Sequence, residues 1–196
     1  MTLANKITLT RTILGVVLYF LIDKTSTTSL ILAFIVLFIS TLSDYIDGKI
    51  ARETNTITRF GAIIDPYADK IIVFSCYLAF ADVKELNIPM FAIFLIILRE
   101  LSVASLRVLA ALDNYVLSAE KSGKFKTLIQ FISIYLIMIY LIMLSLSDRN
   151  LEIAFIVQKF KNLPSYLVVI SSFITVVSGV FYISNHYRMI QKQWKK

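Results

Sequence analysis

Long apolar segments separated by short polar ones run along almost the whole chain. Six of them approach the roughly 20 residues that a membrane-spanning helix needs, at about 9–22, 29–51, 60–81, 88–111, 125–147 and 165–186. The first is short as an apolar run because Arg11 lies near its start. The opening residues MTLANKITLTR carry no signal-peptide cleavage pattern, and Thr2–Lys6 is expected to lie along the membrane surface. The pattern predicts an all-α integral membrane protein with six transmembrane helices and a short N-terminal interfacial segment.

Composition supports this class and excludes others. The chain of 196 residues is 58% hydrophobic and 17% charged, with a mean hydropathy of +0.76, whereas soluble domains are about 45–50% apolar and about 25% charged. Disorder is excluded by the same figures. A single cysteine, Cys76, excludes a disulfide scaffold, and a single histidine, His186, argues against a zinc site. Without linkers, repeats or low-complexity tracts, residues 1–196 are expected to form one membrane domain.

The net charge of +7 follows the predicted topology. Six spans place both termini on one side and the connections 23–28, 82–87 and 148–163 on the other. Those connections contain five basic and five acidic residues and are neutral. Thirteen of the 20 basic residues lie on the opposite side: Lys6, Arg11, Lys49, Arg52, Arg59, Arg107, Lys121, Lys124, Lys126, Arg188, Lys192, Lys195 and Lys196. The positive-inside rule makes this side, with both termini, the cytoplasmic face of a cell membrane, and no nucleic-acid partner is needed to explain the charge.

The third outer connection allows two interpretations. Its apolar residues Ile153, Ile156, Val157 and Phe160 have helical spacing, which favours a helix lying on the outer surface. A plain connector is an equally good interpretation of the same residues.

Four carboxylates stand in or beside apolar segments. Asp44 and Asp47 lie near the end of the second segment, and Asp65 and Asp69 lie near the start of the third. An ionised aspartate at the centre of a membrane helix costs about 2.5–3.5 kcal/mol on insertion scales. Four of them must therefore be neutralised by protons, by basic residues or by metal ions.

Spacing brings the four aspartates together. On a helix, the first two share one face with Gly48, Ala51 and Arg52, and the last two share a face with Gly61. The eight residues ETNTITRF join the two segments, which predicts an antiparallel hairpin with facing carboxylates. The glycines remove side-chain bulk where a ligand or the other helix approaches.

Clustered carboxylates without a Cys or His partner are typical of a hard-cation site. Oxygen ligands favour Mg²⁺ or Mn²⁺, and Ca²⁺ is also compatible. Four negative charges neutralise two divalent ions, and such a pair commonly holds phosphate oxygens. Arg52 suits a phosphate oxygen of the substrate. The alternative for a single intramembrane aspartate is a buried salt bridge between helices.

These residues resemble the signature of the CDP-alcohol phosphatidyltransferases, D-x2-D-G-x2-A-R-x8-G-x3-D-x3-D. Every position agrees: Asp44, Asp47, Gly48, Ala51, Arg52, Gly61, Asp65 and Asp69. The resemblance implies that family's fold of six membrane helices, and a homodimer. It also implies a reaction in which CDP-diacylglycerol reacts with an alcohol, CMP leaves and a phospholipid forms.

The resemblance assigns roles to single residues. Two divalent cations, Mg²⁺ or Mn²⁺, are expected on Asp44, Asp47, Asp65 and Asp69, with Asp69 also as the general base for the incoming hydroxyl. CDP-diacylglycerol is expected to bind at Asp44, Gly48, Ala51, Arg52 and Gly61.

Looser similarities suggest which alcohol is used. Members of the family that use glycerol 3-phosphate are similar in three stretches: NKITLTR at the start, RELSVASLRVLAA from Arg99, and GKFKT from Gly123. A dianionic acceptor needs cations, and the expected ones are Arg107, Lys121, Lys124 and Lys126. The alternative for each lysine is ordinary positive-inside charge. For the Arg99–Glu100 pair, an internal ion pair that supports the fold is favoured over substrate contact.

Three other functions remain as alternatives. One is the same family with another acceptor, such as inositol phosphate, serine or a phosphatidyl lipid. Another is a membrane prenyltransferase, although such enzymes are typically longer and space their aspartates differently. The third is a cation transporter, but its carboxylates would lie near mid-membrane rather than at the ends of their helices.

Overall fold

The computed structural model is helical throughout the part of the chain that it describes. It describes the backbone of residues 3–54, 59–112 and 121–194, and the side chains of residues 10, 12–42, 70–110, 122–187 and 191. Within these ranges there is no β-strand. The predicted all-α class is therefore confirmed.

Each of the six predicted apolar segments corresponds to one long helix. These helices are α1 (Leu3–Asp23), α2 (Thr27–Thr54), α3 (Arg59–Asp82), α4 (Met90–Leu112), α5 (Lys121–Leu146) and α7 (Leu163–Trp194). Three short helices lie between them: the 3₁₀ turns η1 (Lys84–Leu86) and η2 (Ser147–Arg149), and α6 (Leu151–Lys159). Residues 3–6, expected to form an interfacial piece, belong to the continuous helix α1.

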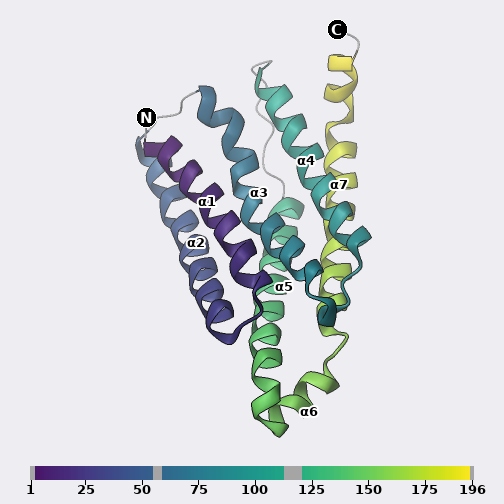
Figure 1. Cartoon of the computed structure of the whole chain (residues 1–196). Helices are drawn as coiled ribbons and strands as arrows, with labels where there is room; N and C mark the ends of the chain where they lie inside the picture. The colour runs from purple at the N-terminus through teal and green to yellow at the C-terminus, as the bar shows by residue number, and fades with distance from the viewer. Residues whose placement is uncertain (1–2, 55–58, 113–120, 195–196) are drawn as a thin grey trace.

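Consecutive long helices run in opposite directions along one elongated bundle (Figure 1). Both ends of the chain lie at the same end of the bundle, as the even number of segments predicts. The connections that contain residues 24–26, 83–89 and 147–162 lie toward the opposite end, where α6 is found. We call these the terminal end and the loop end of the bundle.

Helix α6 decides between the two interpretations of the third outer connection. Asn150 caps it, because its side-chain oxygen accepts hydrogen bonds from the backbone N–H groups of Glu152 at 2.9 Å and Ile153 at 3.4 Å. Of its apolar residues, Val157 is buried, whereas Leu151 is 90% exposed and Phe155 is 69% exposed. The segment is thus a surface helix with a wide apolar exposed face, and not a plain connector.

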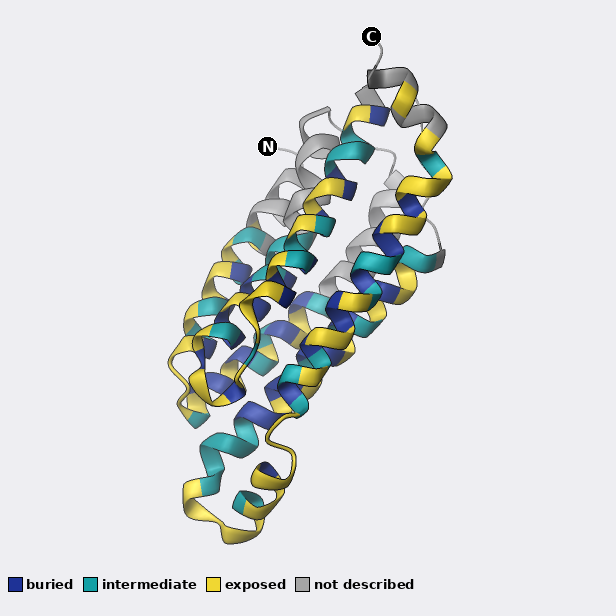
Figure 2. Cartoon of the chain, turned by 90° about the vertical axis from the view of Figure 1, so that its right-hand side faces the viewer, coloured by how far each residue is buried: buried dark blue, intermediate teal, exposed yellow. Residues whose placement is uncertain are grey.

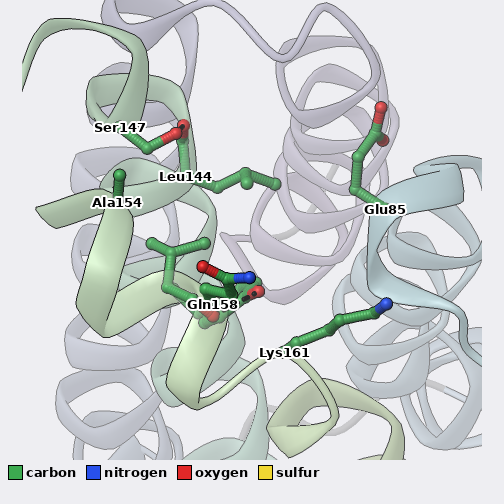
Figure 3. Close-up of a pocket in the computed structure, with 8 residues that line it drawn as sticks. Glu85, Leu144, Ser147, Ala154, Gln158 and Lys161 are labelled. Carbon is green, nitrogen blue, oxygen red and sulfur yellow. Dashed lines mark hydrogen bonds between the residues drawn. The ribbon is translucent and has the colours of Figure 1, made fainter. Parts of the chain in front are cut away.

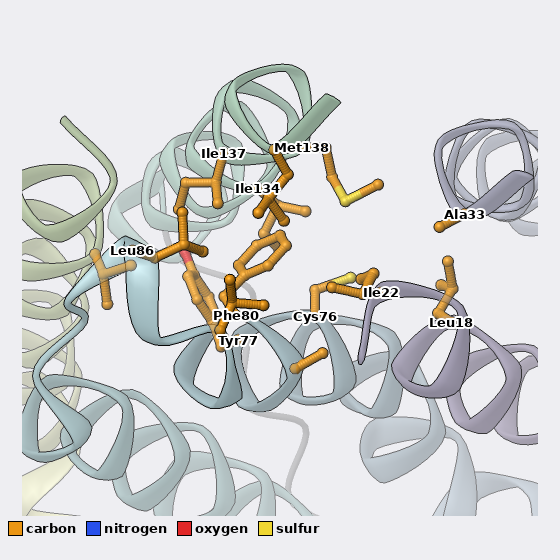
Figure 4. Close-up of a cluster of buried hydrophobic side chains, with 14 of the residues drawn as sticks. Leu18, Ile22, Ala33, Cys76, Tyr77, Phe80, Leu86, Ile134, Ile137 and Met138 are labelled. Atoms are coloured by element: carbon orange, nitrogen blue, oxygen red, sulfur yellow. The ribbon is translucent and has the colours of Figure 1, made fainter. Parts of the chain in front are cut away.

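A continuous apolar core joins the helices. Figure 4 shows part of it, where Tyr77 and Phe80 of α3 approach residues of α5, and Leu18 of α1 lies beside Ala33 of α2. The α5 residues in this cluster include Ile134, Ile137 and Met138, all fully buried. Cys76 is a buried free thiol that packs within this core.

The outside of the bundle is strongly apolar. Exposed residues face outward along the helices while buried ones face the interior (Figure 2), and the exposed set includes Phe20, Phe38, Phe94, Phe173 and Val180. The interior, by contrast, contains buried polar residues such as those at 100, 126, 130 and 175. An apolar exterior around a partly polar interior is what a lipid environment stabilises, since lipid tails solvate apolar side chains as well as the core does.

Length and composition identify candidate spans within the described residues. Two helical stretches, Ser122–Arg149 and Leu151–Tyr187, are long and apolar enough to cross a membrane. Two shorter apolar helices, Thr12–Asp23 and Thr27–Leu42, accompany them. These stretches support a membrane protein, and the count of six spans remains a prediction.

Helices α1 and α3 come into close contact at Gly15. A Cβ atom at this position would lie 2.6 Å from Ile71 Cγ2 and 3.3 Å from Ser75 Oγ. Because Ile71 is β-branched and its χ1 is stiff within a helix, it cannot easily turn aside. The glycine is therefore a packing requirement of the α1–α3 contact.

We expect Gly15→Ala to destabilise the protein. Overpacking costs about 1–3 kcal/mol, and the better helix propensity of alanine offsets about 1 kcal/mol of it. The matched control is Gly123→Ala, because a Cβ at Gly123 has no neighbour within 4 Å. Thermal unfolding in detergent should give a lower Tm for the first variant only. Equal Tm values would show that the α1–α3 contact accommodates an added methyl group without loss of stability.

Candidate functional site

The aspartate motif lies on two helices that end and begin at the same end of the bundle. Asp44 and Asp47 belong to α2, with Gly48, Ala51 and Arg52 following in its last turns, and Gly61, Asp65 and Asp69 belong to the first half of α3. Figure 1 shows the end of α2 and the start of α3 at the terminal end. The side chains of these eight residues and the connecting residues 55–58 lie outside the described part. The helical hairpin arrangement agrees with the prediction, and the facing of the carboxylates stays a prediction.

The two-metal site likewise stays a prediction. Among the side chains that the structure describes, no group of three or more His, Cys, Asp or Glu residues is close enough to hold a metal ion. The four predicted ligands are not among those side chains.

One carboxylate inside the bundle is surrounded by cations. Glu100 of α4 is 2% exposed, and its Oε1 contacts the amino group of Lys126 of α5, which is 3% exposed. Arg99 Nη1 lies 3.6 Å from Glu100 Oε1, and Lys70 Nζ of α3 lies 3.8 Å from Oε2. The predicted Arg99–Glu100 ion pair is thus present. Two further cations, Lys126 and Lys70, come from the neighbouring helices α5 and α3.

Gln130 of α5 links this carboxylate to two further helices. Its Nε2 donates to Glu100 Oε1 at 3.3 Å and to Thr175 Oγ1 of α7 at 2.9 Å. Its backbone carbonyl accepts from the Tyr77 hydroxyl of α3 at 3.4 Å. Together with the bond from Arg99 Nη2 to Ser178 Oγ of α7, at 3.0 Å, these contacts join α3, α4, α5 and α7 around one polar centre. We call residues 70, 99, 100, 126, 130 and 175 the Glu100 cluster.

Arg107 lies nearer the terminal end than this cluster. It follows Glu100 by seven residues, which places it about 10 Å farther along α4. Its Nε donates to the Tyr182 hydroxyl of α7 at 3.4 Å, and its guanidinium carbon lies 5.4 Å from the centre of the Tyr182 ring. The His186 ring also lies beside it, with 4.6 Å between ring centres. The guanidinium is therefore supported from one side by an aromatic ring.

The three predicted lysines of α5 occupy different environments. Lys124 is exposed, whereas Lys126 is buried against Glu100. Lys121 begins the helix, and its side chain lies outside the described part. Lys124 is therefore accessible from outside the bundle near the terminal end, whereas Lys126 is not.

The sequence motifs do not include Gln130 or Thr175. Both are polar residues within long apolar segments, and that is the signal that identifies them. Their partners could not be inferred from the sequence, because the bonded residues lie on different helices and are 30 and 45 positions apart in the chain.

A cavity of about 300 Å³ lies at the loop end, between η1, α5 and α6 (Figure 3). Glu85 lies on one side of it and Leu144 and Ser147 on the other, with Gln158 and Lys161 between them in the view of Figure 3. It contains none of the predicted site residues and is remote from the Glu100 cluster.

The chain matches the family model described as CDP-alcohol phosphatidyltransferase over residues 1–177. It is 30% identical to a CDP-diacylglycerol–glycerol-3-phosphate 3-phosphatidyltransferase of Bacillus subtilis over 157 residues, which is 80% of this chain and 74% of the relative. A protein of the same description from Aquifex aeolicus is 29% identical over 194 residues, covering 98% of this chain and 100% of the relative. A probable phosphatidylglycerophosphate synthase of Mycobacterium tuberculosis is 32% identical over 149 residues, covering 76% and 63% respectively.

We expect Thr175→Val to destabilise the protein through the Glu100 cluster. Valine has the same shape but removes the oxygen that accepts from Gln130, and leaving a buried donor unsatisfied costs about 1–3 kcal/mol. Thr127→Val is the matched control, because its hydroxyl donates within its own helix, to the Gly123 carbonyl at 3.0 Å. Thermal unfolding in detergent measures both. If the two variants unfold at the same temperature, the bond between α5 and α7 contributes nothing to stability.

Proposed function

The chain belongs to the CDP-alcohol phosphatidyltransferase family, and from this premise we propose that it transfers the phosphatidyl group of CDP-diacylglycerol to glycerol 3-phosphate. The products are phosphatidylglycerophosphate and CMP. The observation that carries the proposal is the complete aspartate signature on α2 and α3, within a chain whose relatives are described by this reaction. The basic residues on α4 and α5 near the terminal end support the choice of a phosphorylated acceptor.

The family generally depends on divalent metal ions, and the donor set here fits them. Asp44, Asp47, Asp65 and Asp69 are proposed to hold two Mg²⁺ or Mn²⁺ ions, because carboxylate oxygens without nitrogen or sulfur partners suit hard cations. When bound, the ions offset the charge of the pyrophosphate and of the departing CMP.

Asp69 is proposed to accept the proton of the attacking hydroxyl. The hydroxyl oxygen then forms a bond to the phosphorus of the phosphatidyl group, and the bond from that phosphorus to the bridging oxygen breaks. CMP leaves with the bond electrons, and the proton resides on the Asp69 carboxylate. A carboxylate that also binds metal is a weak base, so part of its effect is to position the hydroxyl.

The nucleotide side of the site is proposed to be the last turns of α2 together with the start of α3. Here Gly48, Ala51 and Gly61 leave room for the nucleotide, and Arg52 pairs with a phosphate oxygen, beside Asp44. The acyl tails stay in lipid against the apolar exterior.

The acceptor side is proposed to be formed by Arg107, Lys121, Lys124 and Lys126. Exposure of Lys124 and support of Arg107 by the Tyr182 ring favour these two for direct contact with the phosphate. Lys126, buried on Glu100, adds positive potential from within the bundle.

The proposed topology places six spans in a cell membrane, with both termini and the site on the cytoplasmic side. Its support is the excess of basic residues at the terminal end and the neutral connections at the loop end. Residues 1–196 then act as one membrane domain, and the protein works as a homodimer, as the family resemblance implies.

Purified protein in detergent should release CMP from CDP-diacylglycerol when glycerol 3-phosphate and Mg²⁺ or Mn²⁺ are present. Chelation of the metal should stop release, and Asp69→Asn should abolish turnover while CDP-diacylglycerol still binds. Labelled glycerol 3-phosphate identifies the lipid product. Release of CMP with inositol phosphate or serine but not with glycerol 3-phosphate would show that the acceptor is a different alcohol. No release of CMP with any acceptor would overturn the proposed activity.

Lys124→Ala should raise KM for glycerol 3-phosphate by about three- to tenfold, since it removes one exposed charge-assisted contact. KM for CDP-diacylglycerol should not change. Lys159→Ala, which removes an exposed lysine at the loop end, is the matched control for loss of positive charge. An equal rise in both KM values for Lys124→Ala would indicate a structural role instead.

A further inference from the structure

We propose that Glu100 is a positioning residue, which sets Lys70 of α3 and Lys126 of α5 in place at the inner end of the catalytic site. This proposal rests on the proposed function, because the site is defined by it. The observation behind it is a single buried carboxylate in contact with cations from three helices.

The location of the cluster along the bundle connects it to the site. Lys70 directly follows Asp69 on α3, and Lys126 follows Lys124 by two residues on α5. Because one helical residue rises about 1.5 Å, each of these cations lies within about 3 Å, measured along its helix, of a residue assigned to metal or acceptor binding. Glu100 thus links α3, which carries two of the four proposed metal ligands, to α5, which carries the proposed acceptor lysines.

The electrostatics of the cluster require the carboxylate. Lys70, Arg99 and Lys126 all lie against the same carboxylate of Glu100. Three positive charges gathered around one group repel one another strongly where water is scarce. The negative charge of Glu100 lies between them and allows Lys126 to remain 3% exposed. Without that charge, the amino groups of Lys70 and Lys126 would move apart.

The surrounding hydrogen bonds hold the carboxylate itself in one place. Gln130 donates to Oε1 and is fixed in turn by Thr175, which is fully buried. Gly179 of α7 lets Arg99 lie close, since a Cβ there would come within 2.7 Å of Arg99 Cγ. A carboxylate held in this way fixes the positions of the Lys70 and Lys126 amino groups that contact it.

A positioning role and a purely structural role predict different kinetics. If Glu100 only stabilises the bundle, its loss reduces the amount of folded protein and leaves the constants of the folded fraction unchanged. If it acts through Lys126, its loss changes kcat/KM for the acceptor, and this change disappears once Lys126 is also replaced.

The test is a double-mutant cycle of Glu100→Gln and Lys126→Gln in the full-length protein, with rates expressed per folded molecule from thermal unfolding of each variant. We expect Glu100→Gln alone to lower kcat/KM for glycerol 3-phosphate by about tenfold or more. In the Lys126→Gln background the same change should cost less than about twofold, while KM for CDP-diacylglycerol stays constant in all four proteins. Glu85→Gln, at the loop end, controls for loss of a carboxylate.

Since breaking a buried ion pair can prevent folding, Glu100→Asp provides a second measurement. It keeps the charge but shortens the side chain by one methylene, so it should fold and still lower kcat/KM for the acceptor. Independent effects of the two Gln substitutions, or wild-type constants for Glu100→Asp, would overturn the positioning role. The wild-type protein reports on the proposed function separately: if it turns over no glycerol 3-phosphate while another acceptor is used, the cycle is run with that acceptor. If no acceptor is used, both proposals fail.

Discussion

The burial of Glu100 is the constraint on which the arrangement of the helices depends. An ionised carboxylate taken out of water is costly unless cations and hydrogen-bond donors surround it. Here those partners come from α3 and α5, and Arg99 comes from α4 itself. Gln130 then extends the network to Thr175 of α7. Four helices must therefore keep one register, because a shift of any of them by a turn would leave a buried charge or donor without its partner.

The apolar exterior has the complementary role. Lipid cannot drive helices together by the hydrophobic effect in the way that water does, so close packing and polar contacts between helices supply more of the specificity. Buried serines at 133, 171, 172 and 178 fit this view, since small side chains let backbones approach. The interior polar network and the Gly15 contact are thus two ways of defining helix positions in an apolar solvent.

The fold could be predicted well from the sequence, because hydrophobic length is a strong signal in a membrane chain. The ends of the helices were less accurate: α2 continues to Thr54 and α7 to Trp194, beyond the apolar runs that end near 51 and 186. Hydrophobicity locates the part of a helix that contacts lipid, whereas a helix continues into polar sequence wherever its backbone bonds are satisfied. The aspartate motif could be placed on its two helices for the same reason.

The environment of Lys126 could not be predicted in this way. Its neighbours in the sequence are those of an ordinary lysine near a membrane surface, and only the three-dimensional packing brings it onto Glu100. The prediction grouped it with Lys124, which the structure leaves exposed. Two residues of separation on a helix rotate a side chain by about 200°, so neighbours in a motif need not share an environment.

The contact at Gly15 has a consequence for motion. Where a backbone presses directly on Ile71, no intervening side chain can change rotamer to absorb a tilt. Helices α1 and α3 are then expected to move as one rigid body, with the short link between α1 and α2 as the neighbouring point where the chain can bend. Any opening toward the proposed site on α3 would in that case displace α1 as well, so the two helices would change position together.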